Sequence, residues 1–253
     1  HNSFILADPE EAYVLETADD WWIAEKVKNV RSISNGVSIR GKGDIRREGI
    51  INYAKKKGYC RDENNFDFAL TFSGSAPSQS LNSRGGKSAM LLNQYKCNIT
   101  PEMMMEFLRE HEAGLCMHGG FESTGSQVSH LRKEKKKSIH WFTGTTLPCL
   151  SIYKPYIFPI KNQRTLPPGP FTKVNPDWIW SMHTSFLRRY KGFNKKIEVE
   201  NYIKKIRDSE NKLITKVNDA LNEENKISPQ EFSNRISKLN LEAWEKTSKM
   251  IEN

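Results

Sequence analysis

A thiol and an imidazole stand two residues apart near the middle of this chain, at Cys116 and His118. If this stretch is a β-strand, both side chains face the same side, and the pair could act as a nucleophile and its base. The alternative is a buried small side chain next to a hydrogen-bonded histidine. The two residues by themselves favour the second interpretation.

Asn35 is a second candidate, because it follows an expected strand and precedes Gly36. An asparagine amide in such a place can donate a hydrogen bond to the oxyanion that forms during acyl transfer. The pair Asn-Gly is also one of the strongest turn signals in a sequence. Without further information, the turn is the simpler explanation.

The run RGGKS, from Arg84 to Ser88, is similar to the end of a phosphate-binding loop. Such a loop needs a further glycine five residues before the Gly-Lys pair, and Leu81 occupies that position. The stretch in front of the run is not a clear strand either. We therefore expect no nucleotide site here.

The cysteines give no support for a metal site. No two of them have the CxxC spacing that is common in structural zinc sites. A chain of 253 residues does not need a disulfide framework, so a reducing, cytoplasmic location fits best. The four cysteines are Cys60, Cys97, Cys116 and Cys149.

The charge balance is basic, with a net charge of +9 and a pI near 9.3. Such a balance favours anionic partners. The lysines and arginines are spread widely, however, and their densest run, residues 132–137, is typical of a solvated turn between two strands. The solvated turn is the favoured interpretation, and a basic nucleic-acid binder is the weaker alternative, to be tested by a steep loss of affinity with salt. No apolar run approaches the roughly 18 residues that a membrane helix needs.

The first hundred residues are typical of short antiparallel strands followed by helices. Aromatic and β-branched residues alternate between tight turns, which predicts a four-stranded meander. A helix over residues 44–57 is expected next, with Asp44 as its cap and Gly58 at its end. The expected strands are residues 4–8, 12–16, 21–27 and 30–34. Residues 66–72 are expected to form a short strand or helix, and residues 87–95 are expected to form a helix.

The second part repeats this order. A helix is expected over residues 100–111, followed by strands at residues 115–118, 127–131, 138–143 and 149–158. Proline and glycine then accumulate over residues 159–170, where we place a boundary. From Lys195 the chain becomes helical and highly charged, with a capping box at residues 228–231 between two helices. This order predicts an α+β fold with antiparallel sheets and a C-terminal helical hairpin packed on the β core.

The apolar spacing of the two C-terminal helices predicts which side each one buries. The first helix runs to about Leu221. Its expected buried residues are Ile203, Ile206, Leu213 and Val217, and those of the second helix are Phe232, Ile236, Leu239 and Ala243.

Four stretches, taken together, resemble the secernin and cysteine dipeptidase family. In order they are HNSFILADPEEAYVLETADDWWIAEKV with RSISNGVSI, then CMHGGFESTGSQVSHL, HWFTGTTLPCLSIYKPYIF and DWIWSMHTSFLRR. They occur in the order found in that family and cover about residues 2–189. The C-terminal helices carry no part of the resemblance.

The resemblance implies an N-terminal nucleophile hydrolase fold, a four-layer αββα sandwich, here incomplete. Residues 1–190 would form this domain, and residues 191–253 a charged helical hairpin packed on it. In that family the nucleophile is a cysteine exposed as the first residue of the mature chain. Its α-amino group, which titrates near neutral pH, acts as the base. The implied activity is hydrolysis of short peptides, dipeptides above all, with no metal or organic cofactor.

The resemblance also points to residues near the substrate. Asn35 matches the position of an amide donor to the oxyanion. His118, Thr124, Gly125 and Ser126 match a segment that we expect to lie near the pocket. Cys116 and Cys149 are not at the nucleophile position, and we expect both to be structural.

The nucleophile itself is not found at the start of this chain. No cysteine precedes Cys60, and the imidazole of His1 does not supply a thiol. We therefore expect that an N-terminal portion is absent and that this chain alone is inactive. The alternative is a secernin-like regulatory or binding protein on a hydrolase scaffold, without enzymatic activity. The expected partner is a short peptide substrate, and a homo-oligomer is left open.

Overall fold

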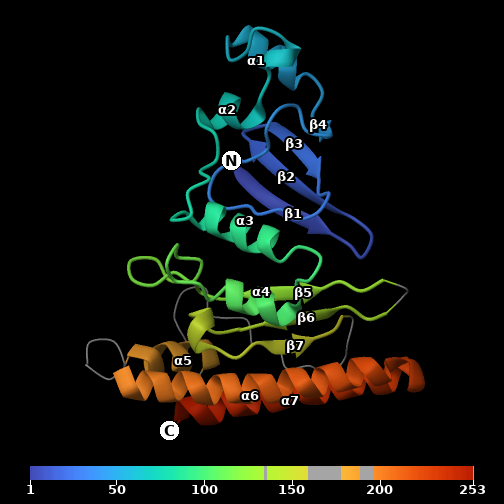
Figure 1. The fold of residues 1–253 in the computed structure, drawn as a ribbon, viewed down its shortest axis with the longest axis vertical. Coiled ribbons are helices and arrows are strands. Elements are labelled where there is room, and N and C mark those ends of the chain that lie inside the picture. The colour runs from blue at the N-terminus through green and yellow to red at the C-terminus, as the bar shows by residue number, and fades with distance from the viewer. Residues whose placement is uncertain (134–135, 159–177, 189–195, 253) are drawn as a thin grey trace. The chain divides into compact units, whose positions relative to one another are not determined.

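The computed structural model describes residues 1–133, 136–158, 178–188 and 196–252 (Figure 1). The chain divides into two compact units. The first comprises His1–Thr100 and Glu112–Leu115, and the second comprises Pro101–His111 and Cys116–Asn253. The fold is mixed α+β, with one antiparallel sheet in each unit and a helical hairpin at the C-terminus. The boundary expected at residues 159–170 lies outside the described residues.

The sheet of the first unit has the order β1-β2-β3-β4, with every pair antiparallel. Its strands are β1 (Asn2–Ala7), β2 (Ala12–Ala18), β3 (Trp21–Lys26) and β4 (Ile45–Arg46). The first two hairpins are confirmed, because the turn residues behave as their types predict. The carboxylate of Asp8 accepts the backbone N–H groups of Glu10 and Glu11 at 2.7 and 2.8 Å, which closes the first turn.

The predicted fourth strand is wrong, since residues 30–34 have no regular structure and β4 lies further along. The Asp44 N–H donates to the Ala24 carbonyl at 2.8 Å, and its carboxylate accepts the Lys26 N–H at 2.7 Å. These bonds place β4 on the edge of β3. The predicted helix over residues 44–57 therefore shortens to α1 (Ile50–Lys56). It begins after Gly49, whose φ is 83°, and Asp44 is not its cap.

The remaining helices of the first unit are η1 (Glu63–Asn65), α2 (Phe68–Ser73) and α3 (Arg84–Gln94). The structure explains the second glycine of the RGGKS run, Gly86, without a phosphate. Ser83 caps α3 by accepting the Gly86 N–H at 3.1 Å. A Cβ on Gly86 would lie 2.1 Å from the Ser80 carbonyl oxygen, so only glycine fits this first turn.

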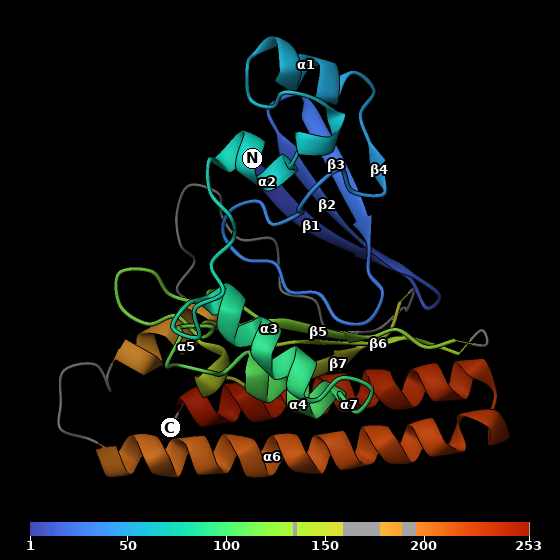
Figure 2. The same ribbon diagram turned by 45° about the horizontal axis from the view of Figure 1, so that its top comes forward.

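The second unit has a three-stranded antiparallel sheet of order β5-β6-β7 (Figure 2). Its strands are β5 (Gln127–His130), β6 (Ile139–Phe142) and β7 (Lys154–Tyr156). The helices are α4 (Pro101–Phe107), η2 (Pro148–Leu150), α5 (Ile179–Arg188), α6 (Lys196–Glu223), η3 (Glu224–Lys226) and α7 (Pro229–Glu252). Helix α7 packs on β7, and α6 runs beside α7.

The helical hairpin is confirmed. Ser228 caps α7 by accepting the Glu231 N–H at 3.1 Å. All four residues predicted to be buried on α7 are buried, as are Ile206, Leu213 and Val217 on α6, while Ile203 is half-buried. Two polar contacts join α7 to the sheet. Asn240 donates to the Pro155 carbonyl, and the Trp244 indole donates to the Tyr156 hydroxyl, each at 2.9 Å.

Three predictions for the second unit need correction. Residues 115–118 form no strand, because the Cys116 N–H turns back to the Glu110 carbonyl at 2.8 Å. Helix α4 ends at Phe107 rather than at His111, and tight turns follow it. The strand expected over residues 149–158 is only Lys154–Tyr156, because Pro148 starts η2 immediately before it.

Strand β1 presents an apolar edge. Phe4, Ile5 and Leu6 are 47, 51 and 54% exposed, and no described strand pairs with the outer side of β1. An exposed apolar edge strand readily pairs with another chain. We expect Ile5→Lys to reduce self-association, measured by light scattering at increasing concentration. It should change the free energy of unfolding by less than about 0.5 kcal/mol. Unchanged self-association would contradict the role given to this edge.

Within the described ranges, no helix has both the length and the apolarity needed to cross a bilayer.

Candidate functional site

The first unit contains a cavity of about 840 Å³ around the Asn35 turn. Its walls come from residues 30–38, from the loop between α2 and α3, and from one side of α3. Three arginines line it. Arg31 is paired with Glu25 at 2.9 Å and Arg40 with Asp67 at 2.6 Å. The third, Arg84, contacts the neutral side chain of Asn35, so its charge is not compensated by that contact.

The contact between Arg84 and Asn35 fixes the orientation of the asparagine side-chain amide. Arg84 Nη2 lies 2.6 Å from Asn35 Oδ1. A guanidinium has only donors, so the amide atom that faces it must be the oxygen. The Asn35 NH₂ group therefore points away from Arg84, as a hydrogen-bond donor at the cavity wall.

A buried carboxylate holds the segment that follows Asn35. Glu16 on β2 is fully buried, and it accepts the Ser38 N–H at 2.7 Å and the Ile39 N–H at 2.8 Å. The Ser38 hydroxyl donates to the same carboxylate at 2.6 Å. On the other side, the hydroxyls of Ser32 and Ser88 are hydrogen-bonded, which links residues 30–34 to the first turns of α3. The Asn35 turn is thus held by bonds on both sides.

The second unit gathers two histidines and two cysteines. The ligand atoms of His111, Cys116, His118 and Cys149 all lie within 4.8 Å of one another. His118 Nε2 is 3.5 Å from Cys116 Sγ and 3.3 Å from Cys149 Sγ. The rings of His111 and His118 meet edge to face, with centroids 4.8 Å apart. Both sulfur-bearing residues are buried, and both histidines are exposed.

The two thiols of this cluster affect each other strongly. The pKa of Cys116 is lowered, first by its hydrogen bond with Cys149 and then by those with His111 and His118. The pKa of Cys149 is raised by the same hydrogen bond and by burial. One thiolate therefore forms readily at the cluster, and the second proton is held more tightly. A low-pKa thiol is the form that acts as a nucleophile or binds a metal.

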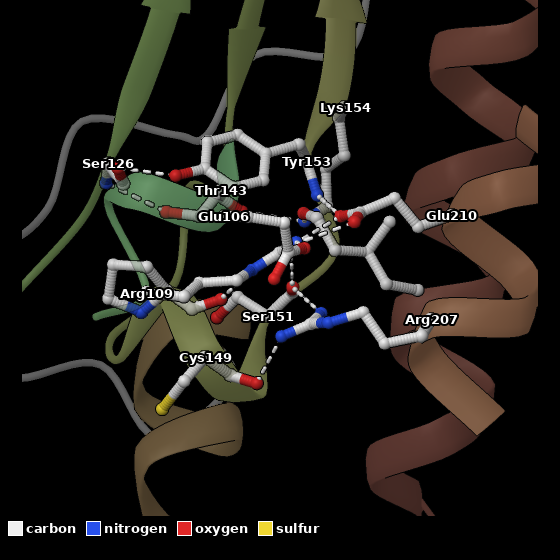
Figure 3. Close-up of polar contacts among 12 residues, drawn as sticks. Glu106, Arg109, Ser126, Thr143, Cys149, Ser151, Tyr153, Lys154, Arg207 and Glu210 are labelled. Carbon is white, nitrogen blue, oxygen red and sulfur yellow. Dashed lines mark hydrogen bonds and ion pairs between the residues drawn. The ribbon is translucent and has the colours of Figure 1, made fainter. Parts of the chain in front are cut away.

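A buried ion pair supports the backbone around Cys149 (Figure 3). Arg109 Nη2 lies 2.7 and 2.8 Å from the two carboxylate oxygens of Glu210 on α6. Arg109 Nε donates to the Pro148 carbonyl at 3.1 Å, and the Tyr153 N–H donates to Glu210 at 2.8 Å. Arg207, also on α6, donates to the Cys149 carbonyl at 2.6 Å. These bonds tie η2 and the start of β7 to one helix.

Lys154 lies beside this network and is fully buried. It donates to the Thr143 and Ile152 carbonyls at 2.6 and 2.8 Å, and its Nζ is 4.4 Å from the centre of the Trp244 ring. Burial lowers the pKa of Lys154 to about 7, although Glu210 acts in the opposite direction. The lysine is therefore poised to change its charge near neutral pH.

The residues matched to the substrate pocket are divided between the two units. Asn35 belongs to the first unit, and His118, Thr124, Gly125 and Ser126 belong to the second. His118 is a member of the histidine and cysteine cluster. The Thr124 carbonyl accepts the Trp180 indole N–H at 3.1 Å. The Ser126 N–H donates to the Thr143 hydroxyl at 2.9 Å, and the Ser126 hydroxyl accepts the Tyr153 O–H at 2.6 Å. These bonds help to hold the residues just before β5 in place. A Cβ on Gly125 would make one ordinary contact, with Thr143 Oγ1 at 3.9 Å.

Sequence reasoning missed Arg84, His111 and the Arg109–Glu210 pair. Glu210 had a detectable signal, because it lies in the apolar register of α6, four residues after Ile206 and three before Leu213. His111 also had one. It stands five residues before Cys116, so three possible metal ligands fall within eight residues.

No protein-family model matches this chain, and no solved structure matches it. The function is therefore inferred from the geometry of these sites.

Proposed function

We propose that this chain is the central and C-terminal part of a cysteine-type hydrolase of short peptides, dipeptides in particular. Under this proposal the two antiparallel sheets belong to an N-terminal nucleophile hydrolase fold. The observation that carries the proposal is the fixed orientation of Asn35, whose amide oxygen is held by Arg84 at 2.6 Å. The resemblance of four sequence stretches to secernins and cysteine dipeptidases supports it.

The role proposed for Asn35 is to stabilise the oxyanion. Hydrolysis of a peptide bond through a thiol passes through a tetrahedral intermediate with a negatively charged oxygen. A donor that is already oriented stabilises that charge without reorganisation. Arg84 orients the amide, and Glu16 holds the next residues through the Ser38 and Ile39 N–H groups.

Arg84 suits a second role toward a dipeptide. A dipeptide carries its free carboxylate one residue from the scissile bond, so a cation near the oxyanion donor can bind it. The other two arginines of the cavity are paired with carboxylates, whereas the contact of Arg84 with Asn35 leaves its charge available. Charge-assisted bonds between a guanidinium and a carboxylate are among the strongest in proteins.

The nucleophile in this proposal is a cysteine outside these 253 residues. None of the residues that line the Asn35 cavity, all of them described, is a cysteine. The apolar edge of β1 suits an additional strand of the same protein, which would bring the nucleophile to the first unit. A thiol peptidase is active only when its cysteine is reduced, so we propose a reducing, cytoplasmic compartment for it.

The test is hydrolysis of a dipeptide panel by the longest reading frame that contains this chain. We expect Asn35→Ala to lower kcat by about 100-fold with little change in KM, because the lost donor acts mainly in the transition state. Asn52→Ala is the matched control, since Asn52 is exposed on α1 and lies outside this cavity. It should leave kcat unchanged.

Two results would contradict the proposal. One is hydrolysis that is equally fast with Asn35→Ala and with the control variant. The other is a reading frame with no cysteine upstream of His1, which would remove the thiol mechanism. A regulatory or binding role on a hydrolase scaffold would then take its place.

A further inference from the structure

We propose that His111, Cys116, His118 and Cys149 bind a zinc ion tetrahedrally in the second unit. Two thiolates and two imidazoles are a common ligand set for structural zinc, and four-coordinate sites with this composition select Zn²⁺ over hard cations. Among the residues that the structure describes, these four form the group of possible metal ligands. All four ligands belong to the second unit, and none of them is among the residues that line the Asn35 cavity of the first unit.

The distances between the ligand atoms suit such an ion. Zinc lies about 2.3 Å from sulfur and about 2.0–2.1 Å from nitrogen, so tetrahedral angles separate a sulfur and a nitrogen ligand by about 3.6 Å. His118 Nε2 is 3.5 Å from Cys116 Sγ and 3.3 Å from Cys149 Sγ. No pair of ligand atoms in the cluster is more than 4.8 Å apart. The four side chains can therefore reach one ion with only small movements.

The charges also balance. Zinc brings two positive charges, and two thiolates neutralise them, so the filled site adds no net charge to a region that already holds Arg109 and Arg207. Binding releases the protons that the two thiols still carry. The sulfurs are buried and the imidazoles are exposed, which gives the ion a route from solvent past the histidines.

The backbone around the ligands is already held in place. The Cys116 N–H donates to the Glu110 carbonyl at 2.8 Å, and the Ser123 hydroxyl accepts the Met117 N–H at 3.0 Å. On the other side, Arg207 donates to the Cys149 carbonyl at 2.6 Å. The ion would join the turn after α4, the segment after Cys116 and η2. With four protein ligands, the site has no open position and is structural.

Other uses of the same side chains fit less well. A nucleophile and its base need one thiol and one imidazole, but this cluster has two of each, and both sulfurs are within 3.5 Å of the same nitrogen. A disulfide between Cys116 and Cys149 would leave both histidines without a role. A zinc site uses all four side chains.

The first measurement is the metal content of the 253-residue chain, purified under reducing conditions and freed of any affinity tag. We expect about one zinc per chain by mass spectrometry of the metal. Replacement of zinc by Co²⁺ should give the visible absorption bands of a tetrahedral ion, together with a thiolate-to-cobalt charge-transfer band. Neither readout depends on enzymatic activity.

Variants then assign the ligands. His111→Asn and His118→Asn change exposed side chains and should leave the fold intact, while zinc affinity falls by more than about 100-fold. Cys116→Ser and Cys149→Ser each remove one of the two thiolates and should each lower the charge-transfer band to about half, while the double variant should abolish it. Cys97→Ser and His130→Asn are the matched controls, because both side chains are exposed and lie outside the cluster. The controls should bind as the wild type does.

Three outcomes would overturn the proposal. The wild-type chain could take up neither zinc nor cobalt. All four ligand variants could retain the metal as tightly as the controls. The freshly purified chain could carry a Cys116–Cys149 disulfide that persists in the presence of zinc.

Discussion

Glu210→Ala is expected to lower the free energy of unfolding of the second unit by about 3–5 kcal/mol. The side chains of Arg109 and Glu210 are only 5 and 2% exposed, and two bonds of 2.7 and 2.8 Å join them. Burial opposes the charge of Arg109, but Glu210 and Glu106 together outweigh this effect and keep the Arg109 pKa above its usual value. Removal of the carboxylate leaves a buried cation without this partner. Urea denaturation followed by circular dichroism measures the loss.

Two controls isolate the buried charge. Glu242→Ala removes the carboxylate of the solvent-accessible Lys216–Glu242 pair, which joins α6 to α7, and should cost less than about 1 kcal/mol. The double variant Arg109→Met/Glu210→Leu should be more stable than Glu210→Ala, because it removes the Arg109 charge together with its partner. It should not reach wild-type stability, since the Tyr153 N–H and the Pro148 carbonyl lose their partners. Equal losses for Glu210→Ala and Glu242→Ala would contradict a structural role for the buried pair.

The sequence predicted those elements whose signals are local. The turn at Asp8 and the cap at Ser228 are each made by a side chain that bonds backbone groups within three residues. The buried side of α7 also follows directly from its apolar spacing, from Phe232 to Ala243. The architecture of two antiparallel sheets and a helical hairpin follows from such signals.

Elements that depend on distant residues were predicted wrongly. Residues 30–34 have the composition of a strand, but the edge of β3 is taken by β4, which Asp44 fastens through Ala24 and Lys26. The helix expected from Asp44 is shortened for the same reason. These outcomes depend on which segment reaches the sheet edge, and no local pattern encodes that.

In the candidate sites, too, residues with a local sequence signal were predicted, and residues that act through a distant partner were missed. Asn35 was found from its own neighbours, but the partner that orients it, Arg84, is 49 residues away. The cluster was missed because Cys149 comes 31 residues after His118, a separation that matches no common metal motif. Glu210 is 101 residues from Arg109, and only its place in an apolar register marks it.

The stability of the second unit is expected to rise with pH because of Lys154. Burial holds its pKa at about 7 in the folded chain, below the 10.5 of an ordinary lysine. Between these values the unfolded chain binds a proton that the folded chain has released, so the free energy of unfolding increases with pH. From about pH 6 to about pH 10 the gain from this group should be about 2–4 kcal/mol. Denaturation across this range, for wild type and Lys154→Met, measures it.

Lys154→Met removes the titrating group and keeps an apolar chain of similar length against Trp244. The variant should lose the rise in stability between neutral and alkaline pH. It should also lose the bonds to the Thr143 and Ile152 carbonyls at every pH, which lowers its stability by a constant amount. The difference in slope between the two proteins therefore isolates the charge from the packing. Lys238→Met, an exposed position on α7, should keep the wild-type slope. If Lys154→Met keeps that slope as well, Lys154 does not change its charge on folding, and its ammonium group is accommodated in the core by the two carbonyls and the ring of Trp244.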